Sequence, residues 1–138
     1  SATDPDLSSH LAFEAANVRL GVDVSERDPA DICLTGLIDV PAGNPPGSPA
    51  TVQGTTRCFT MSVAAAGRAN YRTRLARTDH DPVWVLGVSP DGYVAATAGD
   101  QSVAIQRNGY MRRTPAPIAT VRLRHNDGSQ LTVPIGRG

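Results

Sequence analysis

The stretch from Ile118 to Ile135, with the sequence IATVRLRHNDGSQLTVPI, decides the fold class. Val121 and Leu123 alternate with arginines, and apolar residues again occupy every second position after the intervening turn. A period of two is typical of strands with one buried face. Asn126-Asp127-Gly128 supplies residues that accept a positive φ, as a tight hairpin turn requires. The stretch therefore predicts two antiparallel strands joined by a hairpin.

Further strand-like segments lie upstream of this hairpin. Val83–Leu86 is apolar at every position, which predicts a central strand covered on both faces, with Trp84 as the leading core residue. The Pro41–Ala50 segment contains four prolines and two glycines, so we expect an exposed connection there. The predicted strands are residues 22–24, 31–40, 59–66, 71–77, 83–88, 93–98, 102–110, 118–125 and 131–135.

One segment, Asp4–Leu20, fits a helix, with Asp4 as its cap and Pro5 in its first turn. Lysine is absent and glutamate is rare, so the residues that usually cover exposed helices are missing elsewhere. Short strands at regular spacing predict an all-β fold, mainly an antiparallel sandwich or small barrel. We expect a single β-rich domain over residues 21–138 and a short helix within the N-terminal segment 1–20.

The two cysteines are well separated: Cys33 lies in a predicted strand, and Cys58 opens the apolar segment 59–66. Redox-active pairs usually lie two residues apart at a helix start, so a structural disulfide is favoured. Cytosolic thiols would keep such a pair reduced, which indicates an extracytoplasmic location. The sequence contains no signal peptide and no apolar run of membrane-spanning length. We therefore expect a processed secreted form, or the outer part of a protein with its membrane anchor outside this chain.

The formal net charge is zero, but the charge is unevenly distributed. Residues 1–40 carry eight acids and two arginines, whereas residues 41–138 carry eleven arginines and five acids. The simplest interpretation is pairing of the halves within one fold, and the same polarity would allow head-to-tail self-association. A phosphate-binding stripe is a further interpretation, with tyrosines for stacking, but zero net charge and few aromatics disfavour nucleic acid. Its members would be Arg72, Arg74, Arg77, Arg107, Arg112, Arg113, Arg122, Arg124, Tyr71, Tyr93 and Tyr110.

The reactive residues do not form a recognisable catalytic or metal-binding pattern. Ser89 resembles a hydrolase nucleophile on its turn, but the second glycine is missing and Pro90 removes the N–H that would help to hold an oxyanion. Asp79-His80-Asp81 precedes a proline and fits a polar turn better than a converging site. We therefore expect no enzyme activity, cofactor or metal site.

Two parts of the chain resemble a group of uncharacterised extracytoplasmic domains of high-GC bacteria. They are Ile32-Cys33-Leu34, followed by the Pro/Gly-rich connection and Cys58, and the segment 85–94. In those β-rich domains two cysteines precede a Gly-Val-x-Pro-Asp-Gly turn, and valines stand where this chain has Ser89 and Tyr93. The resemblance covers residues 30–135 and implies a Cys33–Cys58 bond in the outer part of a membrane-anchored protein, without catalytic residues.

These observations lead to the hypothesis of a non-enzymatic, secreted or surface-exposed structural or binding module stabilised by one disulfide. The alternatives are a self-assembling extracellular subunit and an arginine-rich polyanion-binding domain. The expected partner is another protein or a second copy of the chain. The candidate binding surface comprises the Pro41–Ala50 loop together with Arg72, Arg74, Asp79, His80, Asp81, Arg122 and Arg124.

Overall fold

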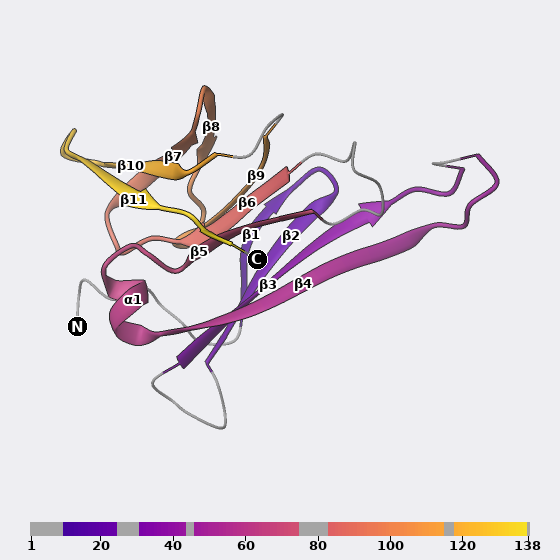
Figure 1. Ribbon diagram of the computed structural model, residues 1–138, viewed down its shortest axis with the longest axis horizontal. Coiled ribbons are helices and arrows are strands. Elements are labelled where there is room, and N and C mark those ends of the chain that lie inside the picture. Colours follow the sequence, from indigo (N-terminus) through magenta and orange to yellow (C-terminus); the bar gives the residue numbers. More distant parts are fainter. Residues whose placement is uncertain (1–9, 25–30, 44–45, 75–82, 115–117, 138) are drawn as a thin grey trace.

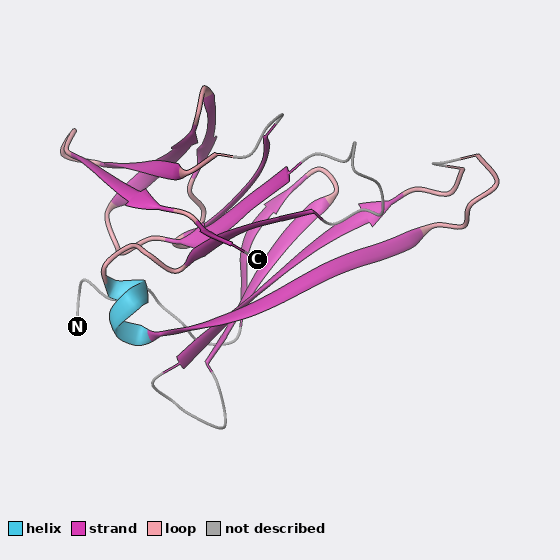
Figure 2. Cartoon of the chain, in the orientation of Figure 1, coloured by secondary structure: helices cyan, strands magenta, loops and turns pink. Residues whose placement is uncertain are grey.

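The computed structural model describes residues 10–24, 31–43, 46–74, 83–114 and 118–137 (Figure 1). These residues form three four-stranded sheets and one short helix, which confirms the all-β prediction (Figure 2). Sheet A is a meander of neighbouring antiparallel strands, in the order β1 (His10–Ala15), β2 (Val18–Val24), β3 (Asp31–Val40) and β4 (Thr51–Thr60).

Sheets B and C combine strands from the rest of the chain. The order in sheet B is β12 (Gly136–Arg137), β5 (Asn70–Arg74), β6 (Val83–Val88) and β9 (Gly109–Thr114), and only β12 runs parallel to its neighbour. The order in sheet C is β11 (Gln130–Pro134), β10 (Thr120–His125), β7 (Tyr93–Ala98) and β8 (Gln101–Ala104). The hairpin predicted from the alternating C-terminal stretch is confirmed as β10 and β11, in register from Thr120 to Arg124.

Strand β6 makes sheet B the middle layer of three. Leu86 and Val88 belong to the apolar cluster shared with sheet A, whereas Val85 belongs to the cluster shared with sheet C. Successive side chains of a strand point to opposite faces, so sheets A and C cover opposite faces of sheet B. The prediction of a central strand covered on both sides is confirmed, and the sandwich has three layers (Figure 1).

The predicted N-terminal helix is wrong for the part of the segment that the structure describes. Residues 10–15 and 18–24 form the hairpin of β1 and β2, while residues 1–9 lie outside the described residues. Val18, Leu20 and Val22 are buried with a period of two. A bulge between Leu11 and Phe13 breaks that period in β1. Across the two strands, Leu11, Ala15 and Val18 are therefore four and three positions apart, which is the spacing expected of one face of a helix.

Three further expectations need correction. Trp84 is only partly buried at the margin of its cluster, and the fully buried large aromatics among the described residues are Phe13, Tyr71 and Tyr110. The segment after Phe59 turns into helix α1 (Met61–Ala65), because Thr60 caps it by accepting a hydrogen bond from the Val63 amide at 3.3 Å. The predicted strand 102–110 is split into β8 and β9 by a turn in which Arg107 and Asn108 have φ values of 48° and 70°.

Candidate binding surface on sheet A

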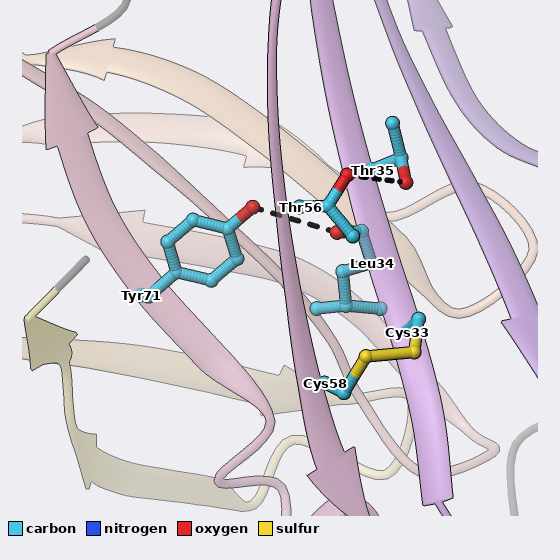
Figure 3. Close-up of a disulfide and its surroundings, with 6 residues drawn as sticks. All are labelled: Cys33, Leu34, Thr35, Thr56, Cys58 and Tyr71. Carbon is cyan, nitrogen blue, oxygen red and sulfur yellow. Dashed lines mark hydrogen bonds between the residues drawn. A yellow bond between two sulfur atoms is a disulfide. The ribbon is translucent and has the colours of Figure 1, made fainter. Parts of the chain in front are cut away.

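The Cys33–Cys58 disulfide joins directly opposed residues of β3 and β4 (Figure 3). Its sulfurs are 1.97 Å apart, which confirms the disulfide prediction. The neighbours of Cys33 in sequence, Ile32 and Leu34, point into the core, so both cysteines lie on the opposite, solvent-facing side of sheet A, where Cys58 is exposed. The bond therefore links two strands of one hairpin rather than two layers.

The spacing of the two cysteines fixes the direction of the backbone groups along β4. Their Cα atoms are 4.0 Å apart, which is typical of a pair that exchanges no backbone hydrogen bonds. The N–H and C=O groups of Cys58 therefore point away from β3, and so do those of Thr56, Gly54 and Val52, because the direction alternates along a strand. Strand β4 is last in sheet A, and no described strand pairs with this outer edge. It presents a row of backbone donors and acceptors ten residues long.

Strand β1, at the other end of sheet A, has a covered edge. The Gln106 side chain accepts a hydrogen bond from the Glu14 amide at 3.1 Å and donates one to the Glu14 carbonyl at 3.0 Å. Arg107 Nη1 donates to the Leu11 carbonyl oxygen at 3.2 Å. Side chains thus occupy the edge groups of β1, as is usual where proteins prevent strand addition. Among the described residues β4 is the longest edge strand without such cover.

The connection between β3 and β4 lies at the projecting end of this hairpin (Figure 1). Its described residues are mostly exposed, which agrees with the predicted Pro-rich connection. A mainly apolar hollow of about 420 Å³ lies at the base of the connection, and Val52 on its wall is 58% exposed. The Asn17 side chain and the Arg19–Asp39 ion pair, 3.0 Å long, lie beside it.

The turn that carries Ser89 is held by Asn108. The Asn108 side-chain amide donates to the Ser89 carbonyl at 3.1 Å and to Asp91 Oδ1 at 2.8 Å, while the Ser89 amide donates to the Asn108 carbonyl at 2.7 Å. Ser89 is completely buried, and Gly92 has a φ of 91°. The Gly-Val-x-Pro-Asp-Gly motif is therefore a turn between β6 and β7, tied to the β8–β9 turn.

A polar cluster at the tip of the β10–β11 hairpin was not predicted as a unit. His125 Nδ1 lies 3.2 Å from Asp127 Oδ1, and the Ser129 hydroxyl donates to the same carboxylate oxygen at 2.6 Å. Hydrogen bonds from Ser129 lower the pKa of Asp127, with a smaller effect from His125. The serine bonds to the acid and His125 Nε2 packs against Gly92, so the order of a Ser-His-Asp triad is absent. The hydroxyl and carboxylate stabilise the turn instead.

The arginines of the candidate surface lie on two different faces. Arg122 and Arg124 are exposed on the outer face of sheet C, opposite Thr132 and Gln130 of β11. Arg72 and Arg74 lie in sheet B, where Arg72 Nη1 donates to the Ile118 carbonyl at 2.9 Å. The structure therefore does not bring these four arginines together. Asp79, His80, Asp81 and Arg77 lie outside the described residues.

Comparisons with known proteins return no matching family model, curated protein or solved structure. Within the described ranges no helix is long and apolar enough to span a membrane. The same part of the chain contains no group of three or more His, Cys, Asp or Glu side chains arranged to hold a metal ion. The candidate site is accordingly the β3–β4 hairpin with its disulfide, its free edge and the hollow at its projecting end.

Proposed function

We propose that this chain is a non-enzymatic module of an extracytoplasmic compartment, secreted or displayed on the cell surface, where it acts by binding or assembly. The observation that carries this proposal is the disulfide on the solvent-facing side of sheet A. An exposed disulfide is accessible to thiols, and cytosolic thiol systems keep such pairs reduced. The oxidised hairpin is therefore suited to an oxidising compartment.

The β3–β4 hairpin is the working surface in this proposal. It combines a projecting Pro-rich connection, an apolar hollow with an exposed valine, and a long edge of backbone donors and acceptors. Loops and edges on a rigid sheet are common recognition surfaces. The disulfide fixes the two strands in register, so the hairpin is ordered before a partner binds and loses little conformational entropy on binding.

A non-enzymatic role is supported by the positions of the reactive side chains. Ser89 is buried in a turn, and Ser129 and Asp127 are occupied with each other in the hairpin tip. Neither arrangement offers a nucleophile to a histidine base, as acyl-transfer chemistry requires.

The location can be tested in the native cells. Free thiols are alkylated at lysis, the cells are fractionated, and the masses of the two cysteine peptides are measured without reduction. We expect a disulfide-linked peptide pair in the extracytoplasmic or surface fraction. A parallel sample reduced before alkylation shows that both cysteines can react. Recovery of the chain in the cytosolic fraction, with both cysteines alkylated, would overturn the proposal.

A further inference from the structure

Within the described residues, the outer edge of β4 lacks most of the devices that normally prevent strand addition. The strand contains no proline and no lysine, and its register with β3 is unbroken over ten residue pairs. Proteins usually protect edges with charges, prolines, bulges or short strands. Strand β1 of the same sheet has both a bulge and the Gln106 and Arg107 cover, so among the described residues one edge of sheet A is protected and the other is not.

The charge on β4 does not oppose contact with an identical strand. Arg57 is its one charged residue, and the guanidinium lies over the rings of Phe59 and Tyr71, at 5.4 and 5.9 Å from their centroids. Tyr71 belongs to the core between sheets A and B, so Arg57 is directed to the inner side of the strand. The solvent-facing side chains of β4 are all uncharged.

The sequence of β4 is also self-complementary in the antiparallel direction. A two-fold axis at Thr56 sets Gly54 opposite Cys58 and Val52 opposite Thr60 of the other copy. These are the residues whose backbone groups point outward, so each such pair exchanges backbone hydrogen bonds. Gly54 has no side chain to obstruct the disulfide opposite it, and Arg57 lies opposite Thr55 rather than a like charge.

We propose that β4 pairs antiparallel with β4 of a second copy of this chain, so that two copies of sheet A form one continuous eight-stranded sheet. The contact has two-fold symmetry and closes on itself, which makes the assembly a dimer rather than a filament. This inference rests on the proposed function, because it names the partner of the same hairpin.

The test removes one outward N–H group from the edge. Thr56→Pro deletes the central donor of the pairing without breaking a backbone bond to β3, because that N–H points away from β3. It also removes the exposed hydrogen bond between the Thr56 and Thr35 hydroxyls, 3.0 Å long, which Thr56→Lys removes as well. The matched control is Thr132→Pro in β11, the edge strand of sheet C. Ile135 N–H donates to Ala119 O and His125 N–H donates to Ser129 O, so the odd-numbered residues of β11 are the ones that exchange backbone hydrogen bonds with β10. Thr132 belongs to the alternate set, so its N–H points outward too.

The oligomeric state is measured by sedimentation equilibrium over a dilution series, with near-UV circular dichroism as the check on folding. We expect the wild-type chain and T132P to approach twice the 14.5 kDa chain mass, and T56P to remain at the single-chain mass. If T56P unfolds, the pair Thr56→Lys and Thr132→Lys replaces it, because two lysines opposed at the axis repel each other.

Hydrogen exchange then locates the contact. In the dimer the amides of Gly54, Thr56 and Cys58 exchange slowly and become fast on dilution, whereas those of Thr55 and Arg57, which face β3, stay slow throughout. A wild-type chain that stays monomeric at every concentration overturns the dimer, and so does self-association that T56P and T56K leave intact. Either result leaves the thiol measurement in native cells, and with it the proposed function, unaffected.

Discussion

At the residue scale, the least predictable feature is a buried polar contact between sheet B strands. Asn70, Gly87 and Tyr110 come from three strands, and the Asn70 side-chain oxygen accepts a hydrogen bond from the Gly136 amide at 3.1 Å. No described group is in hydrogen-bonding geometry with Asn70 Nδ2 or Tyr110 Oη. The sequence predicts the disulfide because a chain with two cysteines has one possible intramolecular pairing. It does not predict which residues, distant in sequence, surround Gly87.

Gly87→Ala is expected to destabilise the protein by about 1–3 kcal/mol, the usual cost of overpacking. An added Cβ at this position would lie 2.7 Å from Asn70 Cβ and 2.8 Å from the Ala69 carbonyl oxygen. The control is Gly54→Ala, compared at a concentration at which the chain is monomeric, because there the close neighbour at 2.7 Å is the flexible end of Leu37. Urea unfolding of both variants checks the difference, and equal losses would show that the contact at Gly87 yields easily.

Tyr110→Phe is expected to leave the free energy of unfolding unchanged or raise it by up to about 1 kcal/mol, because a buried hydroxyl without a partner is removed. Tyr71→Phe is the matched control and should destabilise the protein. Its hydroxyl donates to the Leu34 carbonyl at 3.5 Å (Figure 3). Chemical denaturation at neutral pH compares the two, and a larger loss for Y110F than for Y71F would contradict the assignment.

The same phenol gives a pH dependence. Complete burial of the phenol raises the pKa of Tyr110 well above its usual value of 10.0. Above about pH 10 the phenol loses its proton in the unfolded chain but keeps it in the folded chain, so the free energy of unfolding falls as the pH rises past about 10. The urea midpoint of Y110F should therefore decline less than that of the wild type between neutral and alkaline pH. Parallel declines would argue against a buried, protonated phenol.

At the element scale, period-two alternation predicted some of the strands whose inner faces meet a core, but β1, most of β2 and most of β4 were not predicted. The bounds of β3, β6 and β7 agree with those predicted, and β10 and β11 agree closely. Local pattern failed where short-range chemistry interrupted it. The bulge in β1, the Thr60 cap of α1 and the turn at residues 107–108 each depend on one or two residues, which a window of hydrophobic periodicity averages out.

Gln106→Ala is expected to weaken the β1 edge. It removes two hydrogen bonds to the Glu14 backbone, each of which contributes roughly 0.5–1.5 kcal/mol. The Glu14 amide should exchange its hydrogen faster, while Gln130→Ala on exposed β11 leaves that amide unchanged. Amide exchange followed by nuclear magnetic resonance measures both, and an unchanged Glu14 rate in Q106A would show that the edge is held in another way.

At the scale of the whole molecule, the sequence predicted a sandwich but not its number of layers, because layer order depends on which strands share a sheet. Among the described residues, the Arg19–Asp39 and His125–Asp127 pairs each join residues of one half of the chain, and the pairing of the two halves with each other stays a prediction. The candidate surface was only partly predictable from the sequence. The edge of β4 is exposed because β4 is the last strand of sheet A, and strand order is not visible in the pattern of residues.

Removal of the disulfide is expected to lower the free energy of unfolding by roughly 3 kcal/mol, since the bond closes a loop in the unfolded chain. The cysteines are 25 positions apart. The double variant Cys33→Ser with Cys58→Ser is compared with the oxidised wild type in guanidinium chloride, and reduced wild type serves as the control. A double variant as stable as the oxidised protein would show that the hairpin needs no covalent bond.

Because β6 is buried on both faces, the packing of each layer depends on the packing of the other two. The β6 backbone cannot shift to accommodate a larger residue at Leu86 without disturbing the packing of Val85 on the opposite face. Deleting one outer sheet would expose one apolar face of β6 to water, so each outer sheet depends on the same central strand. Substitutions are consequently best tolerated in loops, at edges and at outward-facing side chains, where a change in one layer does not disturb the packing of the next.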